Sequence, residues 1–363
     1  MARLFILLFV LLLTGCDQRS SPDYLMEEYL KRISRVTEQS LSYHVPVQLP
    51  RPPELRLREH PVPDIRMKFL DALDLLSCPS LSQVVASRNS SLGKQMLPSQ
   101  RLHYEKLLLA RIGDCLHHLT GSDSKPETVR ILREIAQQKT AQLPASRWNL
   151  LFAHTELAGQ LSDTGRLLSL QGDDGRQGTL AALNYLAGYL PDNSLSQPYT
   201  RQELEQHLQQ LHASDYSGKL LTSSRQLDIT LNQAAAMLEA RMATSPVCPK
   251  GQITPEAERL MNVFRLFYSG EGAIGIQPFL ARVHREGREW RQALSRIMKQ
   301  LPPPPTPEMK VYLDSILTES SPGSLWHILE QATTRHTQVW QELLGQCGRM
   351  PGRPVAAETA RSF

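Results

Sequence analysis

The chain has 363 residues, of which 41% are hydrophobic and 21% are charged. This length and composition exclude a small peptide and a disordered chain, because they supply enough apolar side chains for a large core. Forty lysines and arginines oppose 36 aspartates and glutamates, so the net charge is only +4, and we predict no nucleic-acid partner because no strong basic field is present.

The N-terminal residues have the organisation of a secretory signal peptide. Arg3 precedes an unbroken apolar run, Leu4 to Leu13, which is too short to span a bilayer because a spanning helix needs about 20 residues. The following Leu-Thr-Gly-Cys16 resembles the lipobox of bacterial lipoproteins, in which cleavage occurs before a cysteine that carries lipid. We therefore predict that residues 1–15 are removed, that Cys16 is lipidated and that residues 16–23 form a tether. The alternative is an ordinary signal peptide, or an uncleaved apolar N-terminus, with an incidental cysteine.

Asp17 directly follows the cysteine of the lipobox. An aspartate at this position resembles the signal that keeps lipoproteins of enteric bacteria in the inner membrane. We predict a lipid-anchored protein on the periplasmic side of a cell membrane, with the inner membrane favoured over the outer membrane. The membrane is then one expected partner, contacted through the N-terminal lipid.

Between residues 24 and 349, hydrophobic side chains recur with a period near 3.6, which is typical of helices. The sequence therefore predicts an all-α, irregular multi-helix domain of about 11 to 13 helices. No fixed repeat indicates a regular solenoid. N-terminal signals support several helices: Ser21-Pro22, the capping box of Thr200 and Glu203, Thr254-Pro255 and Thr306-Pro307. The expected helices begin at Ser21 and then cover 64–77, 79–88, 99–120, 125–142, 146–161, 179–190, 201–212, 219–243, 255–269, 276–300, a segment after Thr306 and a final segment ending near Cys347.

Two intervals interrupt the helical pattern. The first, near 45–63, contains six prolines, which forbid a helix and favour an extended chain, with a short strand at Leu55 and Leu57. The second, 162–178, is rich in serine, glycine and aspartate, and it is a candidate boundary between two helical lobes. The periodicity is lost after residue 349, so we predict a disordered tail over 350–363.

Four cysteines remain when Cys16 is assigned to lipid, and an even number in an exported protein indicates disulfides. Three pairings are open. We favour Cys78 with Cys115 and Cys248 with Cys347, because each pair then joins helical segments within its own half of the chain. Zinc is the rival interpretation, but no Cys-x2-Cys or Cys-x2-His spacing occurs.

The chain lacks the sequence motifs of common catalytic and nucleotide-binding sites. No His-Glu-x-x-His, Walker loop or Gly-x-Ser-x-Gly occurs, so we predict no catalytic residue, no metal and no cofactor. His336 lies on an apolar helix stripe, which favours a hydrogen-bonded core histidine over a ligand. Carboxylate pairs at Glu286 and Glu289, or at Asp71 and Asp74, could serve glycan hydrolysis, although such pairs are common on solvated helices.

Two loops contain residues suited to ion binding. The string from Arg88 to Ser99 joins two helices, and a binding hypothesis places Arg88, Asn89 and Ser99 around an anion at the N-terminus of the next helix. The alternative is a satisfied interhelical loop. Gly172-Asp173-Asp174-Gly175 could hold a phosphate or a cation, but a plain surface turn is the favoured interpretation.

Several of these segments together resemble an uncharacterised gram-negative lipoprotein family, domain of unknown function 3080. They are the Cys78 region, the Arg88-to-Ser99 string, Tyr104, Cys115, Cys248-Pro249 and the segment from Val263 to Tyr268. The resemblance covers nearly all of the mature chain. It implies export, lipidation and one fold for the family, and it brings no activity, cofactor or catalytic residue.

These observations predict a non-catalytic binding or scaffolding protein of the cell envelope, whose partner is an envelope protein or polymer. A periplasmic hydrolase of peptidoglycan or another envelope polymer is one alternative, and it requires a cleft with convergent catalytic groups. A small-molecule carrier is another, and it requires an apolar cavity between the lobes. A scaffold requires an exposed apolar surface instead.

Overall fold

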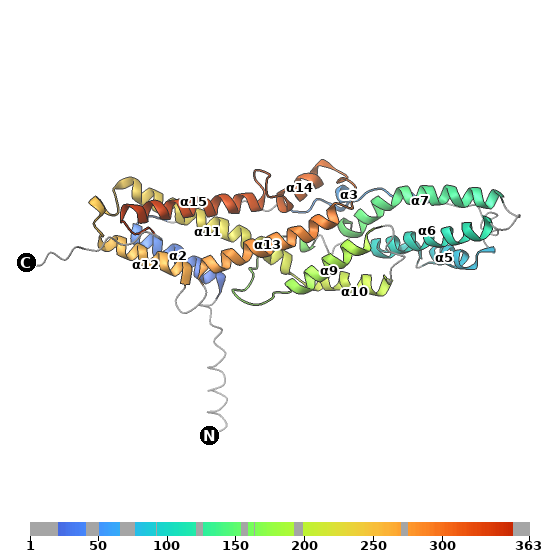
Figure 1. The fold of residues 1–363 in the computed structure, drawn as a ribbon, viewed down its shortest axis with the longest axis horizontal. Coiled ribbons are helices and arrows are strands. Elements are labelled where there is room, and N and C mark those ends of the chain that lie inside the picture. The colour runs from blue at the N-terminus through green and yellow to red at the C-terminus, as the bar shows by residue number, and fades with distance from the viewer. Residues whose placement is uncertain are drawn as a thin grey trace, which may run out of the picture.

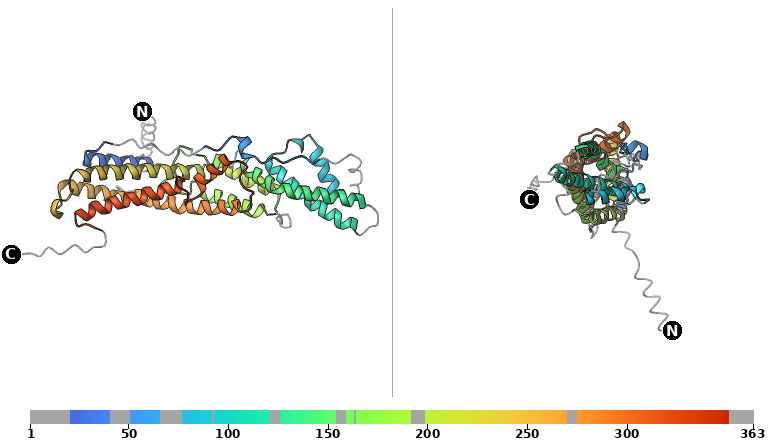
Figure 2. Two further views of the ribbon diagram at one scale, coloured as in Figure 1. Left: turned by 90° about the horizontal axis from the view of Figure 1, so that it is seen from above. Right: turned by 90° about the vertical axis from the view of Figure 1, so that its right-hand side faces the viewer.

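The computed structural model describes residues 21–40, 51–65, 77–91, 93–120, 126–153, 159–162, 164–191, 199–269 and 275–350. These residues form an elongated array of helices (Figures 1 and 2). No strand occurs within these ranges, and the predicted all-α, irregular multi-helix fold is confirmed. The predicted signal peptide, Cys16, Asp17, the Asp71 and Asp74 pair and positions 351–363 lie outside the described residues.

Long antiparallel and crossing helices make up the main body. The longest, α11 (Tyr216–Thr244), packs along α15 (Leu325–Gln346), and α2 (Pro22–Thr37) packs on α11 and α12 (Pro255–Ser269). α13 (Ile276–Met298) connects this group to α9 (Arg176–Tyr189), which packs on α10 (Arg201–Ala213). The main body also includes α3 (Leu55–Arg58), a 3-10 turn at Pro249–Gly251 and α14 (Pro307–Leu317).

The other end of the molecule is a smaller unit, which we call the terminal lobe (Figure 1). It consists of α5 (Pro79–Asn89), the 3-10 turn η3 (Gly93–Gln95) and the adjoining halves of α6 (Pro98–Thr120) and α7 (Pro126–Phe152). Its side chains form a hydrophobic cluster separate from the main core: Cys78, Leu81, Leu108, Ile112, Cys115, Leu119 and Leu132. The described residues therefore contain two cores.

α6 and α7 each enter both cores. Leu102 near the start of α6 and Trp148 near the end of α7 belong to the main core, whereas Ile112 and Leu132 belong to the terminal lobe. We predicted two helices, 125–142 and 146–161, on either side of Pro144, but α7 runs through this proline without a break. Burial explains the difference, because every residue from Ser146 to Phe152 is buried in the main body and packing outweighs the loss of one helical hydrogen bond at proline.

The interval 162–178 does not separate two cores. Leu168, in its middle, is fully buried in the same cluster as Leu151 and Leu186 on either side of it. The amide of Leu168 donates to the Ser223 hydroxyl of α11 at 2.9 Å. The weak helical pattern therefore marks a loop that crosses the main core, and the division lies across α6 and α7 instead.

The described part of the proline-rich segment lies against α7 and α14. The strand predicted at Leu55 and Leu57 is wrong, because Leu55–Arg58 form a helical turn and no neighbouring strand exists among the described residues to pair with it. Two backbone carbonyls of this helical turn accept hydrogen bonds from side chains of other elements. Thr306 donates to the carbonyl of Leu57 at 2.9 Å, and the Trp148 indole donates to that of Arg58 at 2.6 Å. Residues 51–54 and 59–65 have no regular structure, as the prolines predict.

The predicted N-terminal signals of the helices are confirmed. The Ser21 hydroxyl accepts from the amide of Tyr24 at 3.2 Å, and Thr200 and Glu203 form a reciprocal capping box. Thr254 and Thr306 accept from amides three residues further on, at 3.1 and 3.3 Å. Each cap satisfies an amide that the helix itself leaves without a partner.

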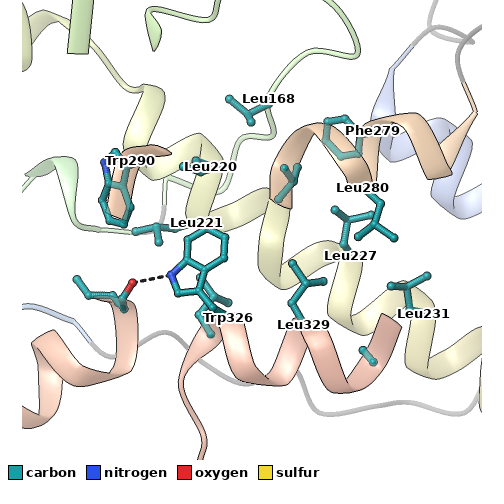
Figure 3. Close-up of a cluster of buried hydrophobic side chains, with 14 of the residues drawn as sticks. Leu168, Leu220, Leu221, Leu227, Leu231, Phe279, Leu280, Trp290, Trp326 and Leu329 are labelled. Atoms are coloured by element: carbon teal, nitrogen blue, oxygen red, sulfur yellow. Dashed lines mark hydrogen bonds between the residues drawn. The ribbon is translucent and has the colours of Figure 1, made fainter. Parts of the chain in front are cut away.

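Large aromatic side chains fill the main core where α11, α13 and α15 meet (Figure 3). Trp290 and Trp326 lie with their rings 6.5 Å apart, and the Trp326 indole donates to the carbonyl of Ile316 at 2.7 Å. Gly287 of α13 lets the Trp326 ring lie against the backbone of that helix, because a Cβ at position 287 would lie 2.3 Å from the ring.

Both favoured disulfides are confirmed. Cys78 joins Cys115 within the terminal lobe, with their Cα atoms 5.6 Å apart, and Cys248 joins Cys347 in the main body, with their Cα atoms 5.1 Å apart. Each core therefore has its own covalent link. Among the described helices, none is both long and apolar enough to cross a membrane.

His336 is a hydrogen-bonded core histidine, as its apolar stripe predicts. The Trp340 indole, a donor only, donates to the Tyr29 hydroxyl at 2.9 Å, and that hydroxyl lies 2.7 Å from Nε2 of His336, to which it donates. Burial lowers the pKa of His336 to about 3. These contacts join α2 to α15.

A pH dependence of stability follows from this burial. The unfolded chain binds a proton at His336 near its ordinary pKa of about 6.5, but the folded chain does not until near pH 3. Stability is therefore lost as the pH falls through this window, by at most about 1.4 kcal/mol per pH unit. We expect His336→Gln to make stability less dependent on pH in urea unfolding at pH 4.5 to 6.5, with a smaller slope remaining because burial also lowers the pKa of His103 and of His284. His212→Gln, at an exposed histidine of α10, should keep the wild-type slope, and equal slopes in all three proteins would contradict the assignment.

Candidate functional site

A groove opens in the terminal lobe between α5, α6 and α7. Its volume is about 550 Å³, within the roughly 300–1,000 Å³ of small-molecule sites. Three helices contribute apolar side chains to its floor, and polar side chains lie around it. The lining residues are Asp64, Ile65, Leu81, Val85, Arg88, Asn89, Lys94, Tyr104, Leu108, Ile112, Leu132, Ile135 and Lys139.

The floor of the groove is a continuation of the terminal core. Leu81, Ile112 and Leu132 are almost fully buried, whereas Val85 and Ile135 are only partly buried. Helical spacing brings such residues together, since side chains three or four positions apart share a helix face. The groove therefore presents apolar surface that the described residues leave partly uncovered.

Cations dominate the polar part of the groove. Arg88, Lys94 and Lys139 line it against one acid, Asp64. Asp64 lies 3.5 Å from the guanidinium of Arg88 and 4.0 Å from that of Arg101. Lys94 is exposed and forms no ion pair with the residues that the structure describes. The rim formed by residues 88–94 therefore has an excess of positive charge.

The loop at this rim is held by local hydrogen bonds. The Arg88 guanidinium donates to the carbonyl of Gly93, whose amide donates to the Ser90 hydroxyl at 3.0 Å. Gly93 packs so closely that a Cβ would lie 2.2 Å from the carbonyl oxygen of Ser87. Only glycine fits there without a shift of the backbone, so the start of η3 is held close to the end of α5.

Buried charges at the base of the lobe fix its position on the main body. Lys139 of α7 and Glu105 of α6, both largely buried, form an ion pair of 2.7 Å. The neighbouring Lys106 donates to the carbonyls of Leu190 and Pro191 at 3.2 and 2.8 Å, and burial lowers the pKa of Lys106 to about 7. Within the groove itself, burial also raises the pKa of Tyr104 to about 12.

The structure brings together two of the three residues predicted around an anion. Arg88 and Asn89 line the groove, but Ser99 does not. Ser99 is buried, and its hydroxyl donates to the Glu205 carboxylate of α10 at 2.9 Å. The prediction of Ser99 as a binding residue is therefore wrong, because that side chain joins α6 to α10.

The carboxylates considered for hydrolysis are held in structural ion pairs. Glu286 is buried, and its carboxylate accepts hydrogen bonds from Arg282 at 2.8 Å and from the Tyr216 hydroxyl at 3.0 Å. Glu289 accepts from Nε of Arg176 at 3.2 Å. Neither carboxylate lines the groove of the terminal lobe.

The glycine-rich turn around Asp174 belongs to the same network. The Asp174 carboxylate accepts from the amide of Ser169 at 3.0 Å and from Arg282 at 3.1 Å. Arg282 also donates to the carbonyls of Ser169 and Gly172. The Asp174 carboxylate therefore fixes the turn. The favoured interpretation, a plain surface turn, included the turn but not its hydrogen bonds to Arg282.

This arrangement is suited to binding. Its lining combines apolar side chains from three helices with the cations Arg88, Lys94 and Lys139. Within the described ranges, three or more metal-ligating side chains nowhere converge. Sequence reasoning did not predict the apolar floor or Lys94. The available signal was the apolar spacing of Leu132 and Ile135, which lie on one face of α7.

A family model described as "Protein of unknown function (DUF3080)" matches residues 26–351. The match confirms the resemblance stated from the residues, and it covers both disulfides and the groove. No curated protein and no solved structure matches the chain.

Proposed function

The chain belongs to the DUF3080 family, and from that premise we propose that it is a membrane-anchored, periplasmic lipoprotein that acts as a non-catalytic binding or scaffolding protein of the cell envelope. The groove of the terminal lobe is its binding site. The observation that supports this proposal is the apolar floor with a cationic rim, on a lobe whose helices α6 and α7 are joined by the buried Lys139–Glu105 ion pair and held to the end of α9 by Lys106.

The proposed membrane anchor is a lipid on Cys16, the cysteine of the lipobox. Ser21, where the described chain begins, is five positions after Cys16, so a lipid on Cys16 lies within about 17 Å of the first turn of α2. α2 is in the half of the molecule away from α5, α6 and α7 (Figure 1). A chain anchored in this way presents the groove away from the point of attachment. Two disulfides agree with an oxidising compartment such as the periplasm.

The non-catalytic part of the proposal depends on the ion pairs of buried Glu286 and of partly exposed Glu289. Glu286 and Glu289 are both consumed in ion pairs with arginines, whereas a hydrolase needs two carboxyl groups that face a substrate. The carrier alternative is favoured by the groove volume, although the groove opens within one lobe and is not a closed cavity between two.

Photo-crosslinking in living cells tests the binding site. A photoreactive amino acid at Val85, on the groove, should give a discrete adduct, because the probe contacts whatever occupies the groove. The matched position is Val311, an exposed valine of α14 that lies outside the groove. Adducts identified by mass spectrometry that are equal at the two positions, or absent at both, would overturn the proposal.

Fractionation tests the anchor. Cys16→Ala should move the protein out of the membrane fraction and abolish its labelling by radioactive palmitate, because the acyl chains provide the membrane affinity. On a density gradient the wild-type protein should follow inner-membrane vesicles, as Asp17 predicts. Unchanged palmitate labelling of the variant would refute lipidation at Cys16, and outer-membrane density would refute the role of Asp17.

A further inference from the structure

We infer that the groove of the terminal lobe binds a single-chain anionic amphiphile, an acyl chain that ends in a carboxylate or a phosphate. This inference rests on the proposed binding function and names the chemical class of the ligand. The acyl chain lies on the apolar floor, and the anionic group lies at the rim formed by Arg88 and Lys94.

The floor matches an acyl chain. Apolar side chains from α5, α6 and α7 line one continuous space, and Val85 and Ile135 expose apolar surface to it. Each methylene that moves from water to such a surface favours binding through the hydrophobic effect. A sugar or a nucleotide would leave its hydroxyl groups without partners over this floor.

The distribution of charge gives the ligand its direction. Arg88, Asn89 and Lys94 are on the same short stretch of chain, where α5 ends and η3 follows, so the cations are concentrated at one edge. The other lining cation, Lys139, is already paired with Glu105 at 2.7 Å. Around the groove four cations, counting Arg101 beside Asp64, face two acids. This excess favours an anionic group over a neutral or cationic one.

The size of the groove favours a small molecule over a folded partner. Its volume of about 550 Å³ is typical of sites that enclose ligands of drug size, which bury most of their surface on binding. A segment of an envelope protein is the competing occupant, and it would give protein adducts from Val85 in the crosslinking experiment.

Fluorescence titration with cis-parinaric acid, an acyl chain with a carboxylate, tests the inference. The protein is the mature chain with Cys16→Ala, which keeps every described residue and removes acyl groups that would compete. We expect saturable binding that palmitate or lysophosphatidylglycerol displaces and hexadecanol displaces more weakly. Stronger displacement by palmitate would identify a fatty acid as the source of the ligand, and stronger displacement by the lysolipid would identify a phospholipid.

Matched variants locate the binding. Val85→Trp fills the groove and should weaken binding at least tenfold, whereas Val311→Trp should not change it. Lys94→Gln should weaken binding of the anionic ligands about threefold, as for an exposed ion pair, and leave hexadecanol unaffected. Arg133→Gln, at an exposed position of α7 outside the lining, is its control. Thermal unfolding checks that each variant folds, and Ile135→Trp replaces Val85→Trp if that variant does not.

The outcomes separate this inference from the proposed function. Absence of saturable binding, or equal binding by the variants that fill the groove, overturns the inference. If a discrete protein adduct still forms from Val85 in cells, the proposed function stands with a different occupant. If neither experiment gives a positive result, both fail.

Discussion

Replacing Cys248 and Cys347 together by alanine is expected to lower the free energy of unfolding by about 4 kcal/mol. The disulfide closes a loop with a sequence separation of 99 residues, and cross-linking a loop of this size removes much conformational freedom from the unfolded chain. Both half-cystines are buried where the end of α15 meets the turn after α11. Urea unfolding followed by circular dichroism measures the loss.

The disulfide of the terminal lobe provides the comparison. Cys78 and Cys115 are only 37 residues apart, so their replacement should cost somewhat less, about 3–4 kcal/mol on the same loop-entropy account. Because this pair links α5 to α6 away from the main core, we expect the variant to lose structure in the terminal lobe first, as amide hydrogen exchange would report. A loss below about 1 kcal/mol for Cys248 and Cys347 would contradict the account.

Arg282→Met is expected to destabilise the main body by about 3–5 kcal/mol, the usual cost of removing one partner from a buried ion pair. Arg282 is largely buried and bonds to Glu286 at 2.8 Å, to Asp174 at 3.1 Å and to two backbone carbonyls. Methionine has a similar reach but leaves Glu286 without the cation at 2.8 Å and leaves Asp174 with only Lys219, 3.8 Å away. The loop around Asp174 should also become more susceptible to proteolysis.

Arg288→Met is the matched control for this substitution. Arg288 is on the same helix, α13, but is exposed, so its replacement should change stability by no more than about 0.5 kcal/mol. The two variants together test whether Glu286 is a structural residue. Wild-type stability in Arg282→Met would indicate that the network contributes little and that the carboxylate is free for another role.

Sequence patterns predicted the local structure better than the arrangement of the helices. Caps such as Ser21 and Thr200 depend on contacts within four residues, so the sequence contains them in full. The sequence left three pairings of the cysteines open, and the favoured one, which joins helical segments within each half of the chain, is confirmed. The continuity of α7 through Pro144 could not be predicted, because it depends on burial of Trp148 and its neighbours by helices that are distant in the chain.

The candidate site was predicted only in part, for a similar reason. Arg88 and Asn89 stood out because the loop that carries them is polar and unusual. The apolar floor did not stand out, since Leu108, Ile112 and Leu132 look like ordinary core positions on their own helices. Their convergence on a groove depends on how α5, α6 and α7 meet. Ser99 was misassigned because an N-terminal serine of a helix is compatible both with a ligand and with a contact such as Glu205.

The main body and the terminal lobe differ in how they place their charged and apolar side chains. The main body buries its charges in pairs and its histidine in a hydrogen-bonded cluster, which serves stability. The terminal lobe leaves apolar surface and cations accessible in one groove. Since α6 and α7 run through both units, the groove is held at a fixed place relative to α2, the helix that follows the proposed anchor.

If a ligand or partner occupies the groove in the cell envelope, a probe inside the groove contacts it, and filling the groove removes that contact. A photoreactive amino acid is placed at Ile135 in the lipidated protein, once in the wild-type background and once with Val85→Trp, which fills the groove from the opposite helix. The account predicts a discrete adduct in the wild-type background that disappears when the groove is filled. An adduct of the same mass and yield in both backgrounds would contradict it.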